Sequence, residues 1–440
     1  MVVMKFGGSS VANAKNIAEV VTIIQEKKEA RVVVFSAMAG VTDSLENVWK
    51  NYQEKSVIDA ECYLIKQVFF TLIEALISSN SSLLISKALV ESTIEELIKQ
   101  ERKRTLSHTK LLSVGEKLTT FIIQQYCQEL NINAELIDAE KLIRLNEEKD
   151  VDTEYIAQSC AKLLNNRSQS KVYITQGFVC SDVNGKTSVL GRGGSDYSAT
   201  LIGSALNARF VEIWSDTNGV LNTDPRKVDK TFTLNEISYD EATEMAFFGA
   251  KILHPKCLIP AKKADVKVLV KNTFNKKDKG TTISWKTDKT TIVKAAAVKE
   301  NITILTITSS RQFNEHEFIC QVFNTLKQQQ INLISVTEAT IAVAILANEN
   351  TNTCVSNLSA FGNVSVSTQK SIITLVGNLS CNKNGNSGTI LKPFKTIPIK
   401  MISYGASNNS ISIVIDEAYQ NLALQNINEQ VFNLKNYKNV

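Results

Sequence analysis

The first 270 residues alternate short apolar segments with segments of helical periodicity, and this alternation restricts the possible folds more than any other feature. Between the first two apolar segments, Ile17, Val20, Val21 and Ile24 repeat at the spacing of one helix face. Short apolar strands separated by helices predict a mostly parallel sheet that is covered on both faces. The strands are expected at residues 2–6, 32–36, 172–175, 211–214 and 266–270.

The segment from about residue 50 to residue 110 is predicted to be helical throughout, as an insertion or lid between two strands. Within it, one helix is expected at residues 62–77 with a core-facing stripe. The stripe consists of Ile65, Phe69, Leu72, Ile73 and Leu76.

The last third of the chain contains an internal repeat. Residues 331–335 (INLIS) recur as residues 399–403 (IKMIS), and each copy precedes a segment of strict alternation, at 340–345 and 410–415. Each copy also follows a strand, at 302–307 and 371–376. We therefore expect a small βαββ module that occurs twice.

The charge and the cysteines narrow the functional classes. The 49 basic and 44 acidic residues are dispersed, which argues against a nucleic-acid-binding protein. The eight cysteines form no C-x-x-C pair and only three histidines occur, so we expect no metal site. The cysteines lie mostly among apolar neighbours, as free thiols do in a reducing compartment. With neither a leader-like start nor a long apolar run, the sequence predicts a cytoplasmic protein without membrane contact.

Two glycine-rich segments can approach an anion. Residues 5–10 (KFGGSS) end the first strand, where a lysine and two glycines suit either a ligand or an ordinary tight turn. Residues 190–199 (LGRGGSDYSA) place Arg192 and three glycines before a helix expected to start near Asp196. An arginine fork at a helix start suits a carboxylate or phosphate, although Asp196 also complements the helix dipole.

Three further segments have both a functional and a purely structural interpretation. Residues 214–226 combine a strand end with two turns, as a decorated loop or as a nucleotide loop would. Residues 113–116 (SVGE) match a capping box at a helix start, or Glu116 binds a substrate ammonium. Lys251 offers a further cation, whereas His254 is expected to cap a helix or lie in the core.

The motifs occur in an order that resembles the aspartokinases, specifically the monofunctional type with paired C-terminal ACT domains. The resemblance extends over essentially the whole chain. It is carried by KFGGSSVA, SAMAGVT, GE, TQGF, LGRGGSDYSA, WSDTNGVLNTDPR and FGAKILHP. It implies an α/β amino acid kinase fold at 1–275, a linker at 276–299 and two ferredoxin-like (βαββαβ) ACT modules at 300–440. The modules are expected at about 310–370 and 371–440, with the strand at 302–307 as a candidate partner of the second module.

The resemblance also implies the reaction, which is transfer of the γ-phosphoryl group of Mg-ATP to the β-carboxylate of L-aspartate. This is the first step towards lysine, threonine and methionine. Lys5 and Asp196 take the catalytic positions, and Arg192 and Glu116 bind the α-carboxylate and α-ammonium of aspartate. The aspartate site comprises Thr42, Glu116, Phe178, Arg192 and Ser195. The ATP site comprises Lys5, Gly7, Gly8, Ser215, Asp216, Leu221, Arg226 and Lys251.

Three positions depart from the family pattern. Ser9 and Ser215 stand where threonine is frequent. Leu221 stands where related enzymes often have tyrosine, which puts a stacking contact with the nucleotide base in doubt.

The ACT modules imply an amino-acid effector and a homodimer or homotetramer. Acidic effector-site positions of lysine-inhibited relatives align with Ile334 and Thr340, so lysine inhibition is expected to be lost, altered or rebuilt through Glu338 or Glu317. The expected effector site comprises Phe318, Ile319, Ile334, Thr337 and Glu338.

Three other functional classes remain open. They are a related kinase acting on glutamate, acetylglutamate or carbamate, a catalytically inactive amino-acid sensor, and a structural protein.

Overall fold

The computed structural model describes residues 1–52, 54–103, 105–164, 171–250, 253–285, 287, 291–310, 314–348, 350–379 and 386–434. They form two compact units. The first consists of residues 1–220, 235–239 and 253–287, and the second of residues 221–234, 240–252 and 288–440.

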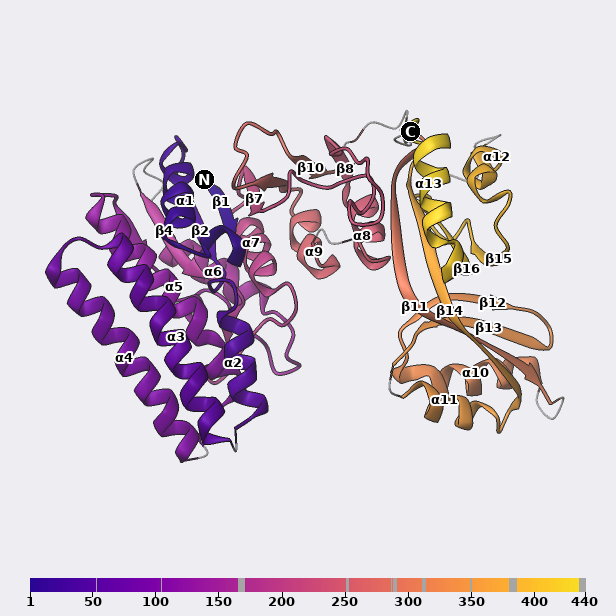
Figure 1. The fold of residues 1–440 in the computed structure, drawn as a ribbon, viewed down its shortest axis with the longest axis horizontal. Helices are drawn as coiled ribbons and strands as arrows, with labels where there is room; N and C mark the ends of the chain where they lie inside the picture. Colours follow the sequence, from indigo (N-terminus) through magenta and orange to yellow (C-terminus); the bar gives the residue numbers. More distant parts are fainter. Residues whose placement is uncertain are drawn as a thin grey trace, which may run out of the picture. The chain divides into compact units, whose positions relative to one another are not determined.

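The first unit is built on an eight-stranded sheet in the order β3-β4-β2-β1-β7-β9-β10-β8 (Figure 1). Neighbouring strands from β3 to β9 are parallel, and β10 runs antiparallel to β9. The prediction of a mostly parallel sheet is thus confirmed. The strands are β1 (Val2–Phe6), β2 (Arg31–Phe35), β3 (Ala134–Leu136), β4 (Val172–Gln176), β7 (Phe210–Ser215), β8 (Glu236–Ser238), β9 (Lys267–Asn272) and β10 (Thr281–Ser284).

Helices cover both faces of this sheet. Val2, Met4 and Phe6 of β1 join a core with helices α1, α3 and α5, whereas Val3 between them lies beside Gly203 of helix α7. Alternate residues of a strand point to opposite faces, so these contacts place the two helix layers. The helices of the unit outside the 41–129 segment are α1 (Ala14–Gln25), α6 (Thr153–Leu163), α7 (Gly194–Ala205) and α9 (Pro255–Lys263).

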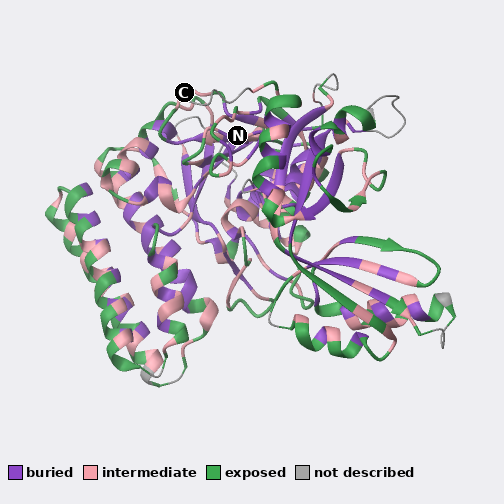
Figure 2. Cartoon of the chain, turned by 45° about the vertical axis from the view of Figure 1, so that its right-hand side comes forward, coloured by how far each residue is buried: buried purple, intermediate pink, exposed green. Residues whose placement is uncertain are grey.

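The segment between β2 and β3 is helical, as predicted. It contains α2 (Val41–Lys50), α3 (Lys55–Leu76), α4 (Asn80–Arg102) and α5 (His108–Glu129). The expected stripe on α3 is buried, and Figure 2 shows buried and exposed residues alternating along the long helices.

The capping box predicted at residues 113–116 is wrong. Helix α5 begins earlier, at His108, and its N-cap is Ser107, whose hydroxyl accepts a hydrogen bond from the Lys110 amide. Ser113 lies inside the helix and donates its hydroxyl to the Lys110 carbonyl oxygen at 2.8 Å. Glu116 is therefore a mid-helix residue, and its carboxylate is available for another role.

Smaller elements connect the sheet to its helices. The hairpin β5 (Val179–Ser181) and β6 (Thr187–Val189) follows β4 and leads to α7. The 3₁₀ turns are η1 (Gly8–Val11) after β1 and η2 (Ala139–Lys141) after β3.

The second unit contains two intertwined βαββαβ modules on one antiparallel sheet, in the order β12-β13-β11-β14-β16-β15. The long strands β11 and β14 each contribute one half to either module. The strands are β11 (Val293–Ser309), β12 (Ile331–Val336), β13 (Thr340–Leu346), β14 (Gly362–Gly377), β15 (Ile399–Ser403) and β16 (Ser410–Asp416). The helices are α10 (Glu315–Thr325), α11 (Thr351–Leu358), α12 (Asn386–Leu391) and α13 (Gln420–Gln430), with 3₁₀ turns η3 (Leu326–Gln328), η4 (Lys392–Phe394) and η5 (Glu417–Tyr419).

Two expectations about this region need correction. Residues 302–307 do not pair with the second module but with 341–346 and 364–370, and residues 293–299 supply the strand that pairs with residues 372–377. The expected linker at 276–299 contains strand β10 and the first half of β11. Its polar composition was misleading because Thr281 and Ser284 are buried, and the Thr281 hydroxyl accepts a hydrogen bond from the Val220 amide.

The second unit also contains residues from the middle of the chain. The Ala296 amide donates to the Asn222 carbonyl oxygen at 2.7 Å, and Asn428 of α13 donates to the Lys230 carbonyl oxygen at 3.0 Å. Helix α8 (Tyr239–Phe247) carries Glu241, which forms a buried ion pair with Lys294 of β11 at 3.0 Å. These contacts attach residues 221–234 and α8 to the second module.

Candidate active site

A cleft of about 660 Å³ lies at the carboxyl ends of β1, β2 and β4 in the first unit. Ligands of open α/β sheets bind at this edge, because the loops that leave parallel strands converge there. Eight residues proposed from the sequence line the cleft. They are Lys5, Gly8, Thr42, Glu116, Phe178, Arg192, Ser195 and Asp196.

Lys5 and Asp196 form an ion pair in the cleft. The Lys5 ammonium lies 2.7 Å from an oxygen of Asp196, and both side chains are mostly buried. Lys5 belongs to β1, whereas Asp196 belongs to the first turn of α7. The pair fixes the position of a cation at a site that is largely shielded from water, where a charge acts strongly on a bound anion.

Glu116 is a buried carboxylate with an unused oxygen. Its side chain projects from α5, accepts a hydrogen bond from the Ala37 amide and has no hydrogen-bond partner in the described structure for Oε2. Burial raises the pKa of Glu116 to about 7. An unpaired buried carboxylate is costly, so a cationic ligand at this wall of the cleft would be stabilised.

Arg192 supplies the opposite charge to Glu116. It is an exposed cation on the loop between β6 and α7, and it also lines the cleft. The loop turns sharply because Gly191 and Gly193 have positive φ angles, of 75° and 72°. A Cβ atom on Gly193 would lie 2.8 Å from Cβ of His254, so the glycine is also required for packing. The cleft thus presents both an arginine fork and a carboxylate.

His254 has the capping role that the sequence predicted. Its Nδ1 accepts a hydrogen bond from the Lys256 amide at the start of α9. Burial and the neighbouring Arg192 and Lys256 lower the pKa of His254, so they favour the neutral ring.

In the glycine loop after β1, one of the backbone amides expected to face a ligand already has a hydrogen-bond partner in the protein. The Gly7 amide donates to the Trp214 carbonyl oxygen at 3.2 Å and is therefore not free for a phosphate. This bond extends the pairing of β1 with β7, so Ser215 at the end of β7 and Asp216 after it lie at the same sheet edge as Gly7 and Gly8.

Three further candidates for the nucleotide site lie outside the described part of the first unit. Leu221 and Arg226 belong to the second unit, where the Arg226 guanidinium forms an ion pair with Asp224. Lys251 falls outside the described residues.

The sequence analysis missed two charged or polar residues at the cleft. Glu46 of α2 and His108 of α5 line it, with His108 Nε2 3.2 Å from a Glu46 oxygen, and the His108 ring stacks on Trp49. No local sequence signal joins these positions, because they are 62 residues apart and meet only through helix packing.

Comparison with known proteins identifies this architecture. The family model described as the amino acid kinase family matches residues 1–272, and an ACT domain model matches residues 373–431. The lysine-sensitive aspartokinase 3 of Escherichia coli is 30% identical over 98% of this chain and 99% of its own length. The chain belongs to the aspartokinase family. Both the amino acid kinase fold and the C-terminal ACT region that the sequence predicted are therefore confirmed.

Solved structures of a relative agree with this aspartokinase fold. The structure of E. coli aspartokinase III with aspartate and ADP, in the R-state, covers 98% of this chain and 100% of its own, with a TM-score of 0.85 and 29% identity. The same relative with lysine and aspartate, in the T-state, gives a TM-score of 0.82.

The effector-site candidates of this aspartokinase lie in the first ACT module, but not all at its surface. Phe318 is buried in the module core, so its side chain is not available to an effector. Ile319 is partly buried, and Ile334, Thr337 and Glu338 are exposed.

The described part of this aspartokinase offers no group of three His, Cys, Asp or Glu side chains that would hold a metal ion. None of its described helices combines the length and apolar character that crossing a membrane requires.

Proposed function

We propose that the chain transfers the γ-phosphoryl group of ATP to the β-carboxylate of L-aspartate, giving 4-phospho-L-aspartate and ADP. The observation that carries this proposal is the presence in one cleft of a buried carboxylate with an unsatisfied oxygen, Glu116, and of a cation, Arg192. Free aspartate carries an ammonium and an α-carboxylate that match these charges. The E. coli relative binds aspartate and ADP in a site of the same fold.

The reaction needs no general base, because the aspartate side chain has a pKa of about 3.9 and is already an anion at neutral pH. The obstacle is repulsion between this anion and the triphosphate. Catalysis then consists of positioning and charge neutralisation, which Lys5, held by Asp196, would supply to the transferred phosphoryl group.

Each residue at the cleft has a defined part in the proposal. Arg192 binds the α-carboxylate through its planar fork, and Glu116 binds the α-ammonium through Oε2. Thr42, Phe178 and Ser195 complete the aspartate site, and they line the same cleft.

The nucleotide is proposed to lie beside the aspartate, along the edge formed by Gly8 and Ser215–Asp216. The neighbouring positions of β1 and β7 support this placement. Leu221, Arg226 and Lys251 stay as proposals for the nucleotide site from the sequence.

Magnesium is proposed to enter with the nucleotide phosphates. Mg²⁺ commonly binds through substrate phosphates together with one or two carboxylates. When bound, the ion would neutralise phosphate charge.

The pH dependence follows from the raised pKa of Glu116. Below pH 7 the carboxyl group is protonated in the free enzyme and loses its attraction for an ammonium. We expect kcat/KM for aspartate to fall about tenfold per pH unit below about pH 7 and to level off above it. At saturating aspartate the bound ammonium favours the ionised carboxylate, so the acid limb of kcat should lie at lower pH.

The control is kcat/KM for ATP across the same pH range with aspartate saturating. If kcat/KM for ATP also falls below about pH 7 when aspartate is saturating, the group that titrates is not protected by bound aspartate. The titration would then belong to a group other than Glu116.

The assay that tests the function is ADP production by the purified protein with Mg-ATP and either L-aspartate or L-glutamate. Turnover with aspartate alone is the expected result. Turnover with glutamate would favour another amino acid kinase, and ATP binding without turnover would favour an inactive sensor. The presence of Lys5, Arg192 and Asp196 in the cleft favours an active kinase over the inactive sensor.

We propose that the ACT modules bind an amino acid and join subunits into a homodimer or homotetramer. Exposed apolar residues on the edge strands β12 and β15, among them Ile334, Val336 and Ile402, support a subunit contact. The E. coli relative binds lysine. Adding lysine, threonine or methionine to the assay tests the expectation that the lysine response is lost or altered in a module that carries Ile334 and Thr340.

We also propose that the enzyme acts in the cytoplasm. The seven cysteines in the described part of the chain are free, and six of them are buried, which suits a reducing compartment.

A further inference from the structure

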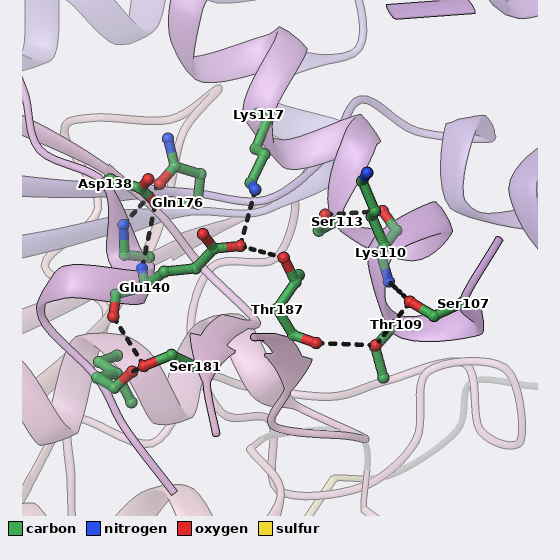
Figure 3. Close-up of polar contacts among 12 residues, drawn as sticks. Ser107, Thr109, Lys110, Ser113, Lys117, Asp138, Glu140, Gln176, Ser181 and Thr187 are labelled. Carbon is green, nitrogen blue, oxygen red and sulfur yellow. Dashed lines mark hydrogen bonds and ion pairs between the residues drawn. The ribbon is translucent and has the colours of Figure 1, made fainter. Parts of the chain in front are cut away.

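Outside the cleft, the carboxylate of Glu140 links two elements of the first unit, and Figure 3 shows its contacts with Lys117 and Thr187. Oε1 of Glu140, in the turn η2, accepts a hydrogen bond from Lys117 Nζ at 2.7 Å and another from Thr187 Oγ1 at 2.6 Å. Lys117 belongs to α5 and Thr187 to β6. Neither Glu140, Lys117 nor Thr187 lines the cleft.

Both partners of Glu140 are close in sequence to the proposed substrate-binding residues. Lys117 directly follows Glu116 on α5. Thr187 lies five residues before Arg192, on the strand that leads into the arginine loop. Because α5 and the β5–β6 hairpin are separate elements, a shared oxygen between them restrains the spacing of the two walls that carry Glu116 and Arg192.

Further hydrogen bonds hold Glu140 and the hairpin in place. Ser181 of β5 donates its hydroxyl to the Glu140 carbonyl oxygen at 2.8 Å. Thr109 of α5 donates to the Thr187 carbonyl oxygen at 2.9 Å, which forms a second link from α5 to β6.

The turn η2 is also fixed to α5 through β4. Gln176 accepts from the Ala139 amide at 2.8 Å and donates to the Thr120 hydroxyl at 2.9 Å. The turn that carries Glu140 is therefore linked to α5 at two residues, Lys117 and Thr120, which lie about one helical turn apart.

We propose that Glu140 is a positioning residue that sets the distance between the ammonium-binding wall and the carboxylate-binding wall of the aspartate site. The proposal rests on the function proposed above. Glu140 does not touch substrate; it acts through Lys117 and Thr187. Geometric misplacement of a binding group weakens substrate binding even when the group itself is intact.

The expected signature is a change in KM without a matching change in kcat. The α-ammonium and α-carboxylate do not react, so their contacts stabilise the bound substrate and the transition state alike. Loss of the Glu140 link should therefore raise KM for aspartate, with kcat and KM for ATP nearly unchanged.

The test uses two substitutions at the β6 end of the link. Thr187→Val keeps the β-branched shape but removes the hydroxyl, and we expect KM for aspartate to rise about five- to tenfold, less than for a lost direct contact with the substrate, because the bond acts only through the position of the wall. Thr187→Ser keeps the donor and should retain a KM within about twofold of wild type. Thermal unfolding of both variants checks that the fold is intact.

Glu140→Gln removes the charge of the shared acceptor and should raise KM for aspartate in the same range. The double variant Glu140→Gln/Thr187→Val should have a KM for aspartate close to that of the single variants, because both substitutions weaken the same hydrogen bond. The matched control is Glu135→Gln on β3, which weakens the ion pair of Glu135 with Lys171 and does not line the cleft.

Each outcome has a definite meaning. Wild-type turnover with aspartate together with an unchanged KM in Thr187→Val would overturn the positioning role but not the proposed function. Equal KM increases in Thr187→Val and Thr187→Ser would also overturn it, because the hydroxyl would then be irrelevant. Absence of wild-type turnover with aspartate would refute the proposed function itself.

Discussion

The Lys5→Ala variant is expected to lose most of its kcat while its KM for aspartate changes only a few-fold. Lys5 is proposed to neutralise charge on the phosphoryl group as it is transferred, which is an interaction strongest in the transition state. Removing one such preorganised group lowers kcat by roughly 100- to 1000-fold. Steady-state kinetics with both substrates varied would measure the two parameters separately.

Lys162→Ala is the matched control, since this lysine is exposed on α6 and lies outside the cleft. Its kcat should equal that of the wild type. A Lys5→Ala enzyme with comparable kcat would remove Lys5 from the chemistry. The Lys5–Asp196 ion pair would then be a structural contact between β1 and α7.

The Arg192→Ala variant should show the opposite pattern, with a large rise in KM for aspartate. Hydrogen bonds to a charged partner contribute about 1.5–3 kcal/mol, which corresponds to a rise of roughly 10- to 100-fold. KM for ATP should stay close to the wild-type value, because the arginine is proposed to contact only the amino acid. Arg192→Lys restores the charge without the planar fork and should recover part of the affinity.

Arg209→Ala provides the control for a lost arginine. Arg209 pairs with Glu29 and precedes β7, so it lies at the amino end of the sheet, opposite the cleft. Equal effects of Arg192→Ala and Arg209→Ala on KM for aspartate would exclude a specific role for Arg192.

Local patterns in the sequence predicted the elements of the kinase sheet well, because buried parallel strands and one-sided helices leave clear periodic signals. The strands around Lys5 and Trp214 and the stripe on α3 are examples. The same patterns misplaced the start of α5. Ser113 and Glu116 fit a capping box, but the residues before them are also good helix formers, and Ser107 takes the cap.

Strand pairing in the C-terminal modules could not be predicted from one repeat alone. The repeat at 331–335 and 399–403 identified the edge strands β12 and β15. The exchange of half-strands in β11 and β14 depends on contacts between residues more than 50 positions apart, as in Ala297 with Thr374. Strand β10 was likewise missed, because its segment has a polar composition. The strand is stabilised by its pairing with β8 and β9.

The sequence by itself determined the α/β class, the repeated modules and the identity of most charged residues in the cleft, because these depend on local periodicity and on motifs. The tertiary structure alone decided three features. These are the burial of Glu116 with one free oxygen, the pairing of Lys5 with Asp196, and the bridge from Glu140 to Lys117 and Thr187. Each depends on burial or on an approach within hydrogen-bonding distance between separate elements, and such distances are set by packing of the whole unit rather than by neighbouring residues.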